Sequence, residues 1–273
     1  MLKVRLLLGC AALIGFVAYS GLALSTAQAP AAPAQAPLPP ALLECPDLAT
    51  ALRTVANNDA RLRDWPQIAR YRDANRTVTA ADVVFMGDSI TDYWPQPRFG
   101  AFFPGKRYVG RGISAQTTPQ MLIRMRPDVI ALHPKAVVIL AGTNDIAGNT
   151  GPMTDEQIEG NLASMAELAA ANGIKVVLSS ITPVSEYHVA SPNAVPQTTS
   201  RPPARVRAVN DWMRQYAASH GHVYLDYFSA MTDDKGLLRA DLSADDLHPN
   251  AAGYAIMAPL AEAAIQKTLA AKQ

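Results

Sequence analysis

The sequence predicts an α/β protein built on one parallel sheet with helices on both faces. Short apolar segments of strand character alternate along the chain with longer segments in which apolar residues recur at helical spacing. The predicted strands are Val83–Met86, Tyr108–Gly110, Ala136–Leu140, Ile174–Leu178 and Val223–Leu225. Strands that alternate with helices are joined by crossovers, so about five parallel strands are expected in a single domain without internal repeats.

Length and composition fit one globular domain with a sizeable core. The chain has 273 residues, of which 49% are hydrophobic and 17% are charged. The formal net charge is +1, which indicates neither a nucleic-acid-binding surface nor a polybasic membrane patch. We therefore expect no nucleic-acid partner.

Residues 1–29 have the features of a secretory signal peptide. Lys3 and Arg5 precede an apolar stretch from Leu6 to about Leu24, and Ala27-Gln28-Ala29 gives the small-x-small pattern of a cleavage site. We expect cleavage after Ala29 and export to the periplasm or the extracellular medium, with no stable membrane contact afterwards. The alternative is an uncleaved anchor, since the apolar stretch is long enough for one.

The expected globular domain covers residues 41–273. Residues 30–40 are rich in alanine and proline, which favours an extended linker. An N-terminal helical extension over about 41–80 precedes the first core strand and is expected to pack outside the sheet. The only cysteines are Cys10 and Cys45, so removal of the signal peptide would leave no intramolecular disulfide.

The first predicted strand runs directly into Gly87-Asp88-Ser89. Its continuous apolar run is typical of a strand buried on both faces. Gly87 is expected to break the strand because glycine tolerates backbone angles that other residues avoid. The turn would hold Ser89 at the carboxyl end of the strand, where open α/β sheets have their active sites. Ser89 is then either a nucleophile or the cap of the next helix.

Helix signals fill the segments between the later strands. A helix is expected from Thr118, with Pro119 in its first turn, to near Pro127. Thr154 and Gln157 form a capping box for the next helix, which Asn172-Gly173 ends. Further helices are predicted over 206–218 and 251–269. Residues 182–203 form a long Pro/Ser/Thr-rich loop, which is typical of a functional or mobile segment.

Four places along the chain carry residues suited to acyl transfer. Ser89 would attack an acyl carbon, and His248 would accept its proton. Asp245, three residues before His248, would fix the imidazole tautomer. The candidate donors to a tetrahedral oxyanion are the backbone N–H groups of Ser89 and Gly112 and the side-chain amide of Asn144. Each feature alone also fits an ordinary turn. Ser89, Gly112 and Asn144 follow strands and the Asp-His segment precedes the last helix, and this joint order favours one site.

The sequence resembles the SGNH branch of the GDSL esterase/lipase superfamily. Gly87-Asp88-Ser89-Ile90 matches the first family block, and Arg111–Thr118 resembles the glycine block. Gly142-Thr143-Asn144-Asp145 matches the asparagine block, and Asp245-Asp246-Leu247-His248-Pro249 matches the Asp-x-x-His block. The resemblance runs from about Asp82 to Leu260.

That resemblance implies a three-layer α/β/α, flavodoxin-like fold with a Ser-His-Asp triad. It assigns Ser89 as nucleophile with Asp245 and His248 as its partners, and Ser89, Gly112 and Asn144 as oxyanion donors. Neither a metal nor another cofactor is required. Asp246 stands where many relatives carry glycine, so it could compete with Asp245 for the imidazole. Thr91 stands where a Gly-x-Ser-x-Gly elbow would have its second glycine, which argues against the ordinary α/β-hydrolase fold.

The expected function is hydrolysis of short-chain acyl esters, acetyl esters above all, by an exported serine esterase acting on a small molecule or a carbohydrate. One alternative is an O-acyltransferase that uses the same site. Lysophospholipase and thioesterase activities are further alternatives, and a non-catalytic binding module would require the loss of a catalytic position. The sequence does not specify the oligomeric state.

Overall fold

The computed structural model describes residues 50, 52–55, 59, 62–189, 191 and 193–271. The described residues from Leu52 onward belong to one compact unit. The predictions of a signal peptide over residues 1–29, of a linker over residues 30–40 and of the state of both cysteines lie outside the described residues.

Five parallel strands form the sheet, in the order β2-β1-β3-β4-β5. This is the strand order of flavodoxin-like doubly wound folds. The predicted fold class is confirmed, and the observed strand ends lie within two residues of the predicted ones. The strands are β1 (Val83–Gly87), β2 (Tyr108–Gly112), β3 (Ala136–Leu140), β4 (Lys175–Ser179) and β5 (Val223–Leu225).

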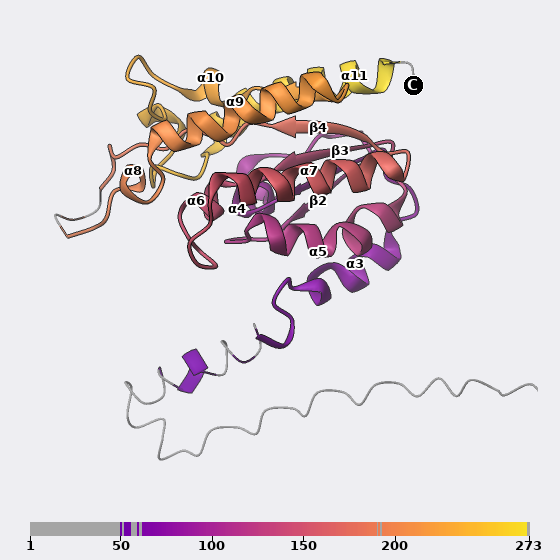
Figure 1. The fold of residues 1–273 in the computed structure, drawn as a ribbon, viewed down its shortest axis with the longest axis horizontal. Helices are drawn as coiled ribbons and strands as arrows, with labels where there is room; N and C mark the ends of the chain where they lie inside the picture. Colours follow the sequence, from indigo (N-terminus) through magenta and orange to yellow (C-terminus); the bar gives the residue numbers. More distant parts are fainter. Residues whose placement is uncertain are drawn as a thin grey trace, which may run out of the picture. The chain divides into compact units, whose positions relative to one another are not determined.

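Helices cover both faces of this sheet (Figure 1). Side chains of α5, α7 and α9 pack on the face that carries Val84 and Met86 of β1. Side chains of α10 and α11 pack on the opposite face, which carries Val83 and Phe85. These helices are α5 (Thr118–Asp128), α7 (Asp155–Ala171), α9 (Pro203–Ser219), α10 (Tyr227–Met231) and α11 (Ala251–Ala270).

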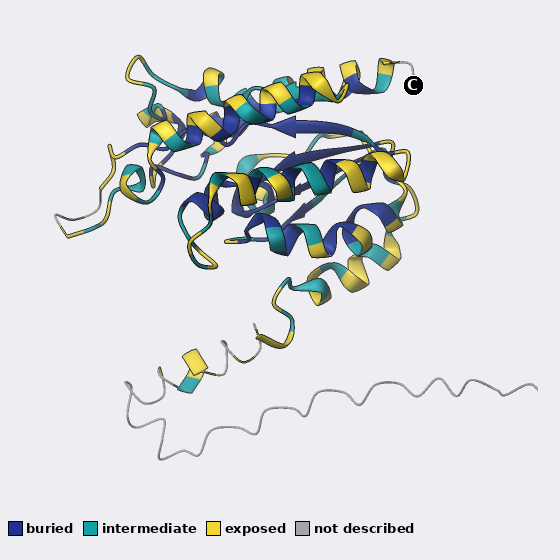
Figure 2. Cartoon of the chain, in the orientation of Figure 1, coloured by how far each residue is buried: buried dark blue, intermediate teal, exposed yellow. Residues whose placement is uncertain are grey.

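The alternation of side chains along β1 explains its unbroken apolar run. Successive side chains of a strand point to opposite faces, so a strand with helices on both sides needs apolar residues at every position. All residues of β1 and β3 are buried. Figure 2 shows buried strands in the middle of the sheet, while the helices alternate between buried and exposed sides. In the described part of the chain, none of the helices combines the length and the apolar character needed to span a bilayer.

The helix ends follow the local signals in the sequence. Helix α5 begins at Thr118 and ends at Asp128, directly after Pro127. The capping box of α7 is present, since Gln157 N donates to Thr154 Oγ1 and Thr154 N donates to Gln157 Oε1. Gly173 follows this helix with a φ of 70°, a left-handed conformation that suits glycine.

The N-terminal extension packs outside the sheet and also forms hydrogen bonds to the ends of α5 and β2. Its described residues include η1 (Ile68–Tyr71) and α3 (Arg72–Thr77). Asn75 Nδ2 donates to Pro127 O at 3.0 Å and to Asp128 Oδ1 at 2.7 Å, which fastens α3 to the end of α5. The Tyr71 hydroxyl donates to the carbonyl of Gly112. The extension therefore reaches the carboxyl end of β2, beside the candidate site.

Further short helices among the described residues lie in loops. They are α4 (Ser89–Tyr93), η2 (Pro97–Phe99), η3 (Ile130–Leu132), α6 (Thr143–Ile146), α8 (Gln197–Ser200) and η4 (Ala240–Leu242). Within its described residues, the predicted long loop over 182–203 carries α8 and the first residue of α9.

Candidate active site

Strand register brings three of the predicted site residues to one edge of the sheet. Gly87, the last residue of β1, pairs with Gly112 of β2 and with Leu140 of β3. Ser89 follows Gly87 by two residues and begins α4. Asn144 lies in α6, just after β3. The strand ends therefore converge as the sequence predicted.

The two glycines at this edge are required by close packing. A Cβ atom at Gly87 would lie 2.1 Å from Thr91 Oγ1, and one at Gly112 would lie 2.1 Å from Asp92 N and 2.7 Å from Asp88 O. The prediction that Gly87 supplies an unusual backbone angle is wrong, because Gly87 continues β1 without a positive φ. Glycine at both positions lets the first turn of α4 lie directly on the sheet edge.

Asp88, not Ser89, caps helix α4. Asp88 Oδ1 accepts a hydrogen bond of 2.9 Å from Ile90 N. The Ser89 hydroxyl is thereby left for another partner, and that partner is His248. Ser89 itself is buried, with 6% of its surface exposed.

Ser89, His248 and Asp245 form a continuous chain of hydrogen bonds. Ser89 Oγ lies 2.9 Å from His248 Nε2, and His248 Nδ1 lies 2.6 Å from Asp245 Oδ2. Asp245 Oδ1 also accepts from the backbone N–H of His248 at 2.7 Å and of Leu247 at 3.1 Å. The carboxylate therefore orients both the imidazole and the backbone segment that carries it.

Electrostatics keep Asp245 ionised. Partial burial acts to raise the pKa of Asp245, but the hydrogen bonds from the His248 ring and backbone outweigh burial and hold that pKa well below its usual range. The Tyr93 ring lies beside the imidazole, with 5.0 Å between the ring centroids. An ionised Asp245 selects the tautomer in which Nδ1 carries the proton and Nε2 faces Ser89.

Asp246 does not compete for the imidazole of His248, so that expectation is wrong. Asp246 adopts a left-handed backbone conformation with φ 66°, and its carboxylate accepts from Ser185 Oγ at 2.6 Å and from His188 N at 2.8 Å. His188 Nδ1 lies 3.0 Å from Asp246 Oδ1. Because of this left-handed conformation, the carboxylates of Asp245 and Asp246 point to different partners. Asp246 therefore anchors the loop after β4.

The Asn144 amide is held between two neighbours. Asn144 is buried, with 3% of its surface exposed. Its Nδ2 donates to Gln116 O at 3.0 Å, and its Oδ1 accepts from Arg201 Nη2 at 3.4 Å. Arg201 also donates through Nε to Thr143 Oγ1 at 3.0 Å. Because Nδ2 carries two hydrogens, one remains available to a ligand.

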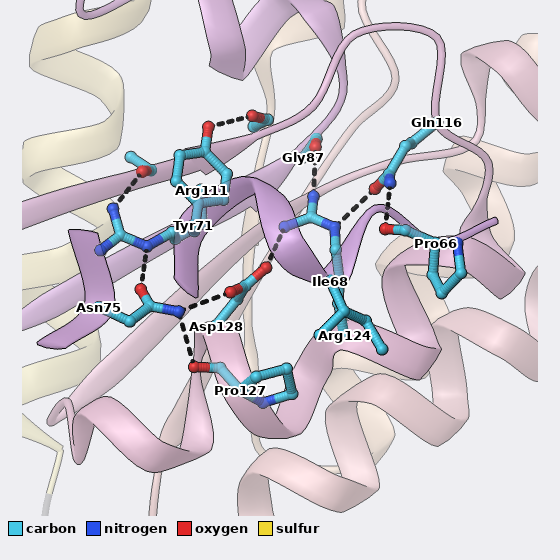
Figure 3. A network of polar contacts seen from close by, with 12 residues as sticks. Pro66, Ile68, Tyr71, Asn75, Gly87, Arg111, Gln116, Arg124, Pro127 and Asp128 are labelled. Atoms are coloured by element: carbon cyan, nitrogen blue, oxygen red, sulfur yellow. Dashed lines mark hydrogen bonds and ion pairs between the residues drawn. The ribbon is translucent and has the colours of Figure 1, made fainter. Parts of the chain in front are cut away.

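The buried side chain of Arg124 links the end of β1, just before Ser89, to the loop that follows β2. Arg124 is fully buried; its Nη2 donates to Gly87 O at 2.9 Å, its Nε donates to Gln116 Oε1 at 2.5 Å, and its Nη1 lies 3.1 Å from Asp128 Oδ2 (Figure 3). Asn75 completes this network by donating to Asp128. The Arg124 side chain therefore holds both Gly87, two residues before Ser89, and Gln116, which accepts a hydrogen bond from Asn144.

The carboxyl group of Asp88, directly before Ser89, is fully buried. Burial raises the pKa of Asp88 to about 6, although the Ile90 backbone bond and the nearby His248 and Arg201 act against the rise. Among the described residues, Asp88 Oδ2 has no hydrogen-bond partner. The group carries an unsatisfied oxygen at neutral pH, which costs folding stability.

Sequence reasoning missed Arg201, Arg124 and Tyr71. Arg201 lies in an aperiodic loop, where no local signal marks it. Arg124 and Asp128 share the buried face of α5 at i, i+4 spacing, and this charged pair among Met121 and Met125 was the available signal. In the part of the chain that the structure describes, no cluster of His, Cys, Asp and Glu could hold a metal ion.

Comparison with known proteins assigns the chain to a family. The model of the GDSL-like lipase/acylhydrolase family matches residues 85–256. A protein from Bacteroides fragilis NCTC 9343, described as an acylhydrolase, is 38% identical with a TM-score of 0.67, and the match covers 75% of this chain and 98% of that one. A GDSL-like lipase from Bacteroides thetaiotaomicron VPI-5482 is 38% identical with a TM-score of 0.66, covering 74% and 98%.

More distant structures share the fold. A variant of an acetylxylan esterase from Geobacillus stearothermophilus is 22% identical with a TM-score of 0.55, and the match covers 72% of this chain and 100% of that one. A search of curated proteins gave no match. The family match covers more than half of the chain, and the two Bacteroides proteins match over nearly their whole length. The chain therefore belongs to the GDSL-like lipase/acylhydrolase family, a family of carboxylic ester hydrolases.

Proposed function

We propose that this protein is an exported serine esterase that removes short acyl groups, acetyl groups above all, from carbohydrate esters. The observation that carries the proposal is the hydrogen-bonded series from Ser89 Oγ through His248 to Asp245, with distances of 2.9 and 2.6 Å. A nucleophile in contact with a base that a carboxylate orients is the arrangement that acyl transfer through a covalent intermediate needs.

In the first half-reaction, Ser89 Oγ attacks the acyl carbon while His248 Nε2 takes the hydroxyl proton. The tetrahedral oxyanion accepts hydrogen bonds from the backbone N–H groups of Ser89 and Gly112 and from Asn144 Nδ2. His248 then returns its proton to the departing alcohol oxygen, the bond from the acyl carbon to that oxygen breaks, and the acyl group stays on Ser89.

In the second half-reaction, water replaces the alcohol. His248 Nε2 takes a proton from the water, whose oxygen attacks the acyl carbon of the ester on Ser89. The second oxyanion occupies the same donors and collapses. Ser89 Oγ leaves with the proton from His248, and the free acid departs. Asp245 stabilises the imidazolium in both halves without accepting its proton.

The preference for short acyl groups rests on the loop after β4. In its described residues this loop carries only the four-residue helix α8 ahead of α9, and this short segment is too small to form an apolar tunnel for a long chain. The acetylxylan esterase that shares this fold is one reason to test acetylated carbohydrates first.

Export rests on the N-terminal sequence. Lys3 and Arg5, the apolar stretch that follows them and Ala27-Gln28-Ala29 support cleavage after Ala29. The test is expression of the full chain, followed by N-terminal sequencing of the exported protein, which is expected to begin at Pro30. A full-length protein that stays in the membrane fraction would instead support the anchored alternative.

The test of the reaction compares wild-type protein with Ser89→Ala on p-nitrophenyl acetate, butyrate, octanoate and palmitate. We expect the acetate to be hydrolysed with the highest kcat/KM, and Ser89→Ala to be inactive and unlabelled by a fluorophosphonate while its circular dichroism stays unchanged. Turnover by folded Ser89→Ala would overturn the mechanism. If a sugar acceptor captured more acyl group than water did, the protein would act as an O-acyltransferase.

A further inference from the structure

A polar cavity of about 400 Å³ lies beside the loop that follows β2. Its size falls within the roughly 300–1,000 Å³ that is usual for small-molecule sites. The wall includes Trp65 and Gln67 from the N-terminal extension, Ser114 and Gln116 from the β2 loop, and Asn149 and Thr150 from the segment after α6. Three separate stretches of the chain therefore meet there.

The cavity adjoins the candidate oxyanion donor. Gln116 O accepts from Asn144 Nδ2 at 3.0 Å, and Asn149 N donates to Asn144 O at 3.0 Å. Gln116 and Asn149 also line the cavity. The cavity wall and the candidate oxyanion donor are therefore joined by direct hydrogen bonds.

The cavity wall is fixed by buried amides. Gln116 Nε2 donates to Pro66 O at 2.7 Å, and Gln120 Nε2 donates to Trp65 O at 2.8 Å. Both glutamines are buried, and Arg124 holds the other end of the Gln116 amide (Figure 3). The Trp65–Pro66 segment is thus tied to the domain by its backbone, which leaves the Trp65 side chain free to serve a ligand.

The free groups on the wall suit a sugar ring. Trp65 is 37% exposed and offers an indole face against which the C–H side of a pyranose can pack. Within the described part of the chain, neither the side-chain amide of Gln67 nor the Trp65 indole N–H forms a hydrogen bond. The side chain of Asn149 is bonded through Nδ2 alone, to Ala115 O. These groups supply donors and acceptors that match hydroxyl groups.

We propose that this cavity is a subsite for a neutral sugar ring on the alcohol side of the scissile ester. The inference rests on the proposed esterase function and specifies its substrate class. No residue that lines the cavity carries a charge, which matches a neutral sugar. A long acyl chain would leave the Gln67 amide and the Trp65 indole N–H unpaired, at a cost for each.

A phosphate headgroup fits less well than a sugar. An adjoining cavity shares Gln67 and Ser114 with this one and is also lined by Asp64, Arg70 and Asp92. Arg70 is the only cation among the lining residues of both cavities, and it is already paired with Asp92 at 3.5 Å. Two carboxylates against one cation disfavour an anionic ligand.

The test measures kcat/KM for two acetyl esters in four proteins. The esters are p-nitrophenyl acetate, which has no sugar, and a partially O-acetylated xylo-oligosaccharide. The proteins are wild type, Trp65→Ala, Gln67→Ala and the matched control Leu62→Ala, whose side chain is exposed on the same segment outside the cavity. Calorimetry on Ser89→Ala, with and without Trp65→Ala, measures binding of neutral oligosaccharides of xylose, mannose, glucose and N-acetylglucosamine.

We expect Trp65→Ala and Gln67→Ala to lower kcat/KM for the oligosaccharide ester at least about tenfold more than for p-nitrophenyl acetate. Leu62→Ala should preserve the wild-type ratio, and Trp65→Phe should recover part of the loss. The subsite is refuted if the ratio is unchanged, if none of the oligosaccharides binds, or if lysophosphatidylcholine binds in their place in a Trp65-dependent manner.

The two measurements also distinguish a failure of the proposed subsite from a failure of the proposed esterase function. If wild-type protein hydrolyses neither ester, the proposed esterase function fails. Calorimetry then still decides the subsite, because Trp65-dependent binding of a neutral oligosaccharide supports it and the absence of such binding refutes it.

Discussion

Two regions of the candidate active site are held in place by different means. The strand-end region contains Ser89, Gly112 and Asn144, and all three residues are buried. The Asp-His segment covers residues 245–248 and is far more open, with 55% of the Asp245 side chain and 23% of the His248 side chain exposed. The proposed nucleophile and oxyanion donors thus lie at the edge of the core, whereas the proposed base and its carboxylate lie near solvent.

The difference extends to the hydrogen bonds that hold each region. Arg124 supports the strand-end region from 37 residues along the chain, through Gly87 O. Asp245 orders the Asp-His segment through bonds to residues two and three positions ahead. The first region is therefore coupled to global stability, and the second is a local structure whose changes should affect catalysis far more than folding.

The largest expected effect is on catalysis in the Asp-His segment. His248→Ala should lower kcat for p-nitrophenyl acetate by roughly 10⁴- to 10⁶-fold, because the nucleophile loses its base. Urea unfolding should show little loss of stability. The double variant Ser89→Ala/His248→Ala should be no slower than either single variant, since the two residues act as a unit. Additive losses would contradict this coupling.

The next effect is on folding in the strand-end region. Arg124→Met should lower the free energy of unfolding by about 3–5 kcal/mol, because it leaves Asp128 buried without its cation. Arg126→Met, on the exposed side of the same helix, is the matched control and should change stability by no more than about 0.5 kcal/mol. Equal urea midpoints for the two variants would show that the buried network does not support the fold.

Asn144→Ala tests whether the strand-end region also takes part in the reaction. Loss of one oxyanion donor should lower kcat about 10²- to 10³-fold with a smaller change in KM. Asn172→Ala, at the exposed end of α7, serves as the control in the same assay. A loss confined to KM would indicate that Asn144 binds the ground state and not the oxyanion.

The buried carboxyl of Asp88 makes the free energy of unfolding depend on pH. Burial raises its pKa to about 6 in the folded protein, above the ordinary value of 3.8, so the folded state keeps its proton between those pH values. The stability it contributes is complete below about pH 4 and is lost as the pH rises through 6. Asp88→Asn keeps an oxygen for Ile90 N and cannot ionise, so its advantage over wild type should grow to about 3 kcal/mol above pH 7.

The measurement for Asp88→Asn is urea unfolding at several pH values between 4 and 8. Asp73→Asn, whose side chain is 89% exposed, is the control for replacing a carboxyl by an amide. A pH-independent difference for Asp88→Asn would mean that the buried carboxyl does not change its protonation in this window.

The smallest expected effect is that of Asp246→Asn, which is best measured beside Asp245→Asn. Asp246→Asn should cost only about 1 kcal/mol of stability, through weaker bonds to Ser185 and His188, and should leave kcat almost unchanged. Asp245→Asn should lower kcat by up to about 10⁴-fold because the imidazole loses the partner that selects its tautomer. Comparable kcat losses in the two variants would show that Asp246 also serves the site.

The sequence predicted the elements whose signals are local. The apolar run of β1 and the capping box at Thr154 depend on residues a few positions apart, and the structure has both. The Asp-x-x-His spacing also acts over one turn, so the contact between Asp245 and His248 was predictable. The choice between Asp245 and Asp246 was not, because it depends on the positive φ of Asp246 and on its partners Ser185 and His188.

The amino-acid sequence by itself determined the order of strands and helices, the helix ends and the residues suited to acyl transfer. These follow from side-chain periodicity and from bonds between near neighbours, which the sequence states directly. Only the tertiary structure decided that Arg124 joins Gly87 to Gln116, that Tyr71 reaches Gly112 and that Trp65 borders a cavity beside Asn144's partners. The partner of a buried polar group depends on which distant segments the packed core brings together, and neighbouring residues in the sequence do not predict it.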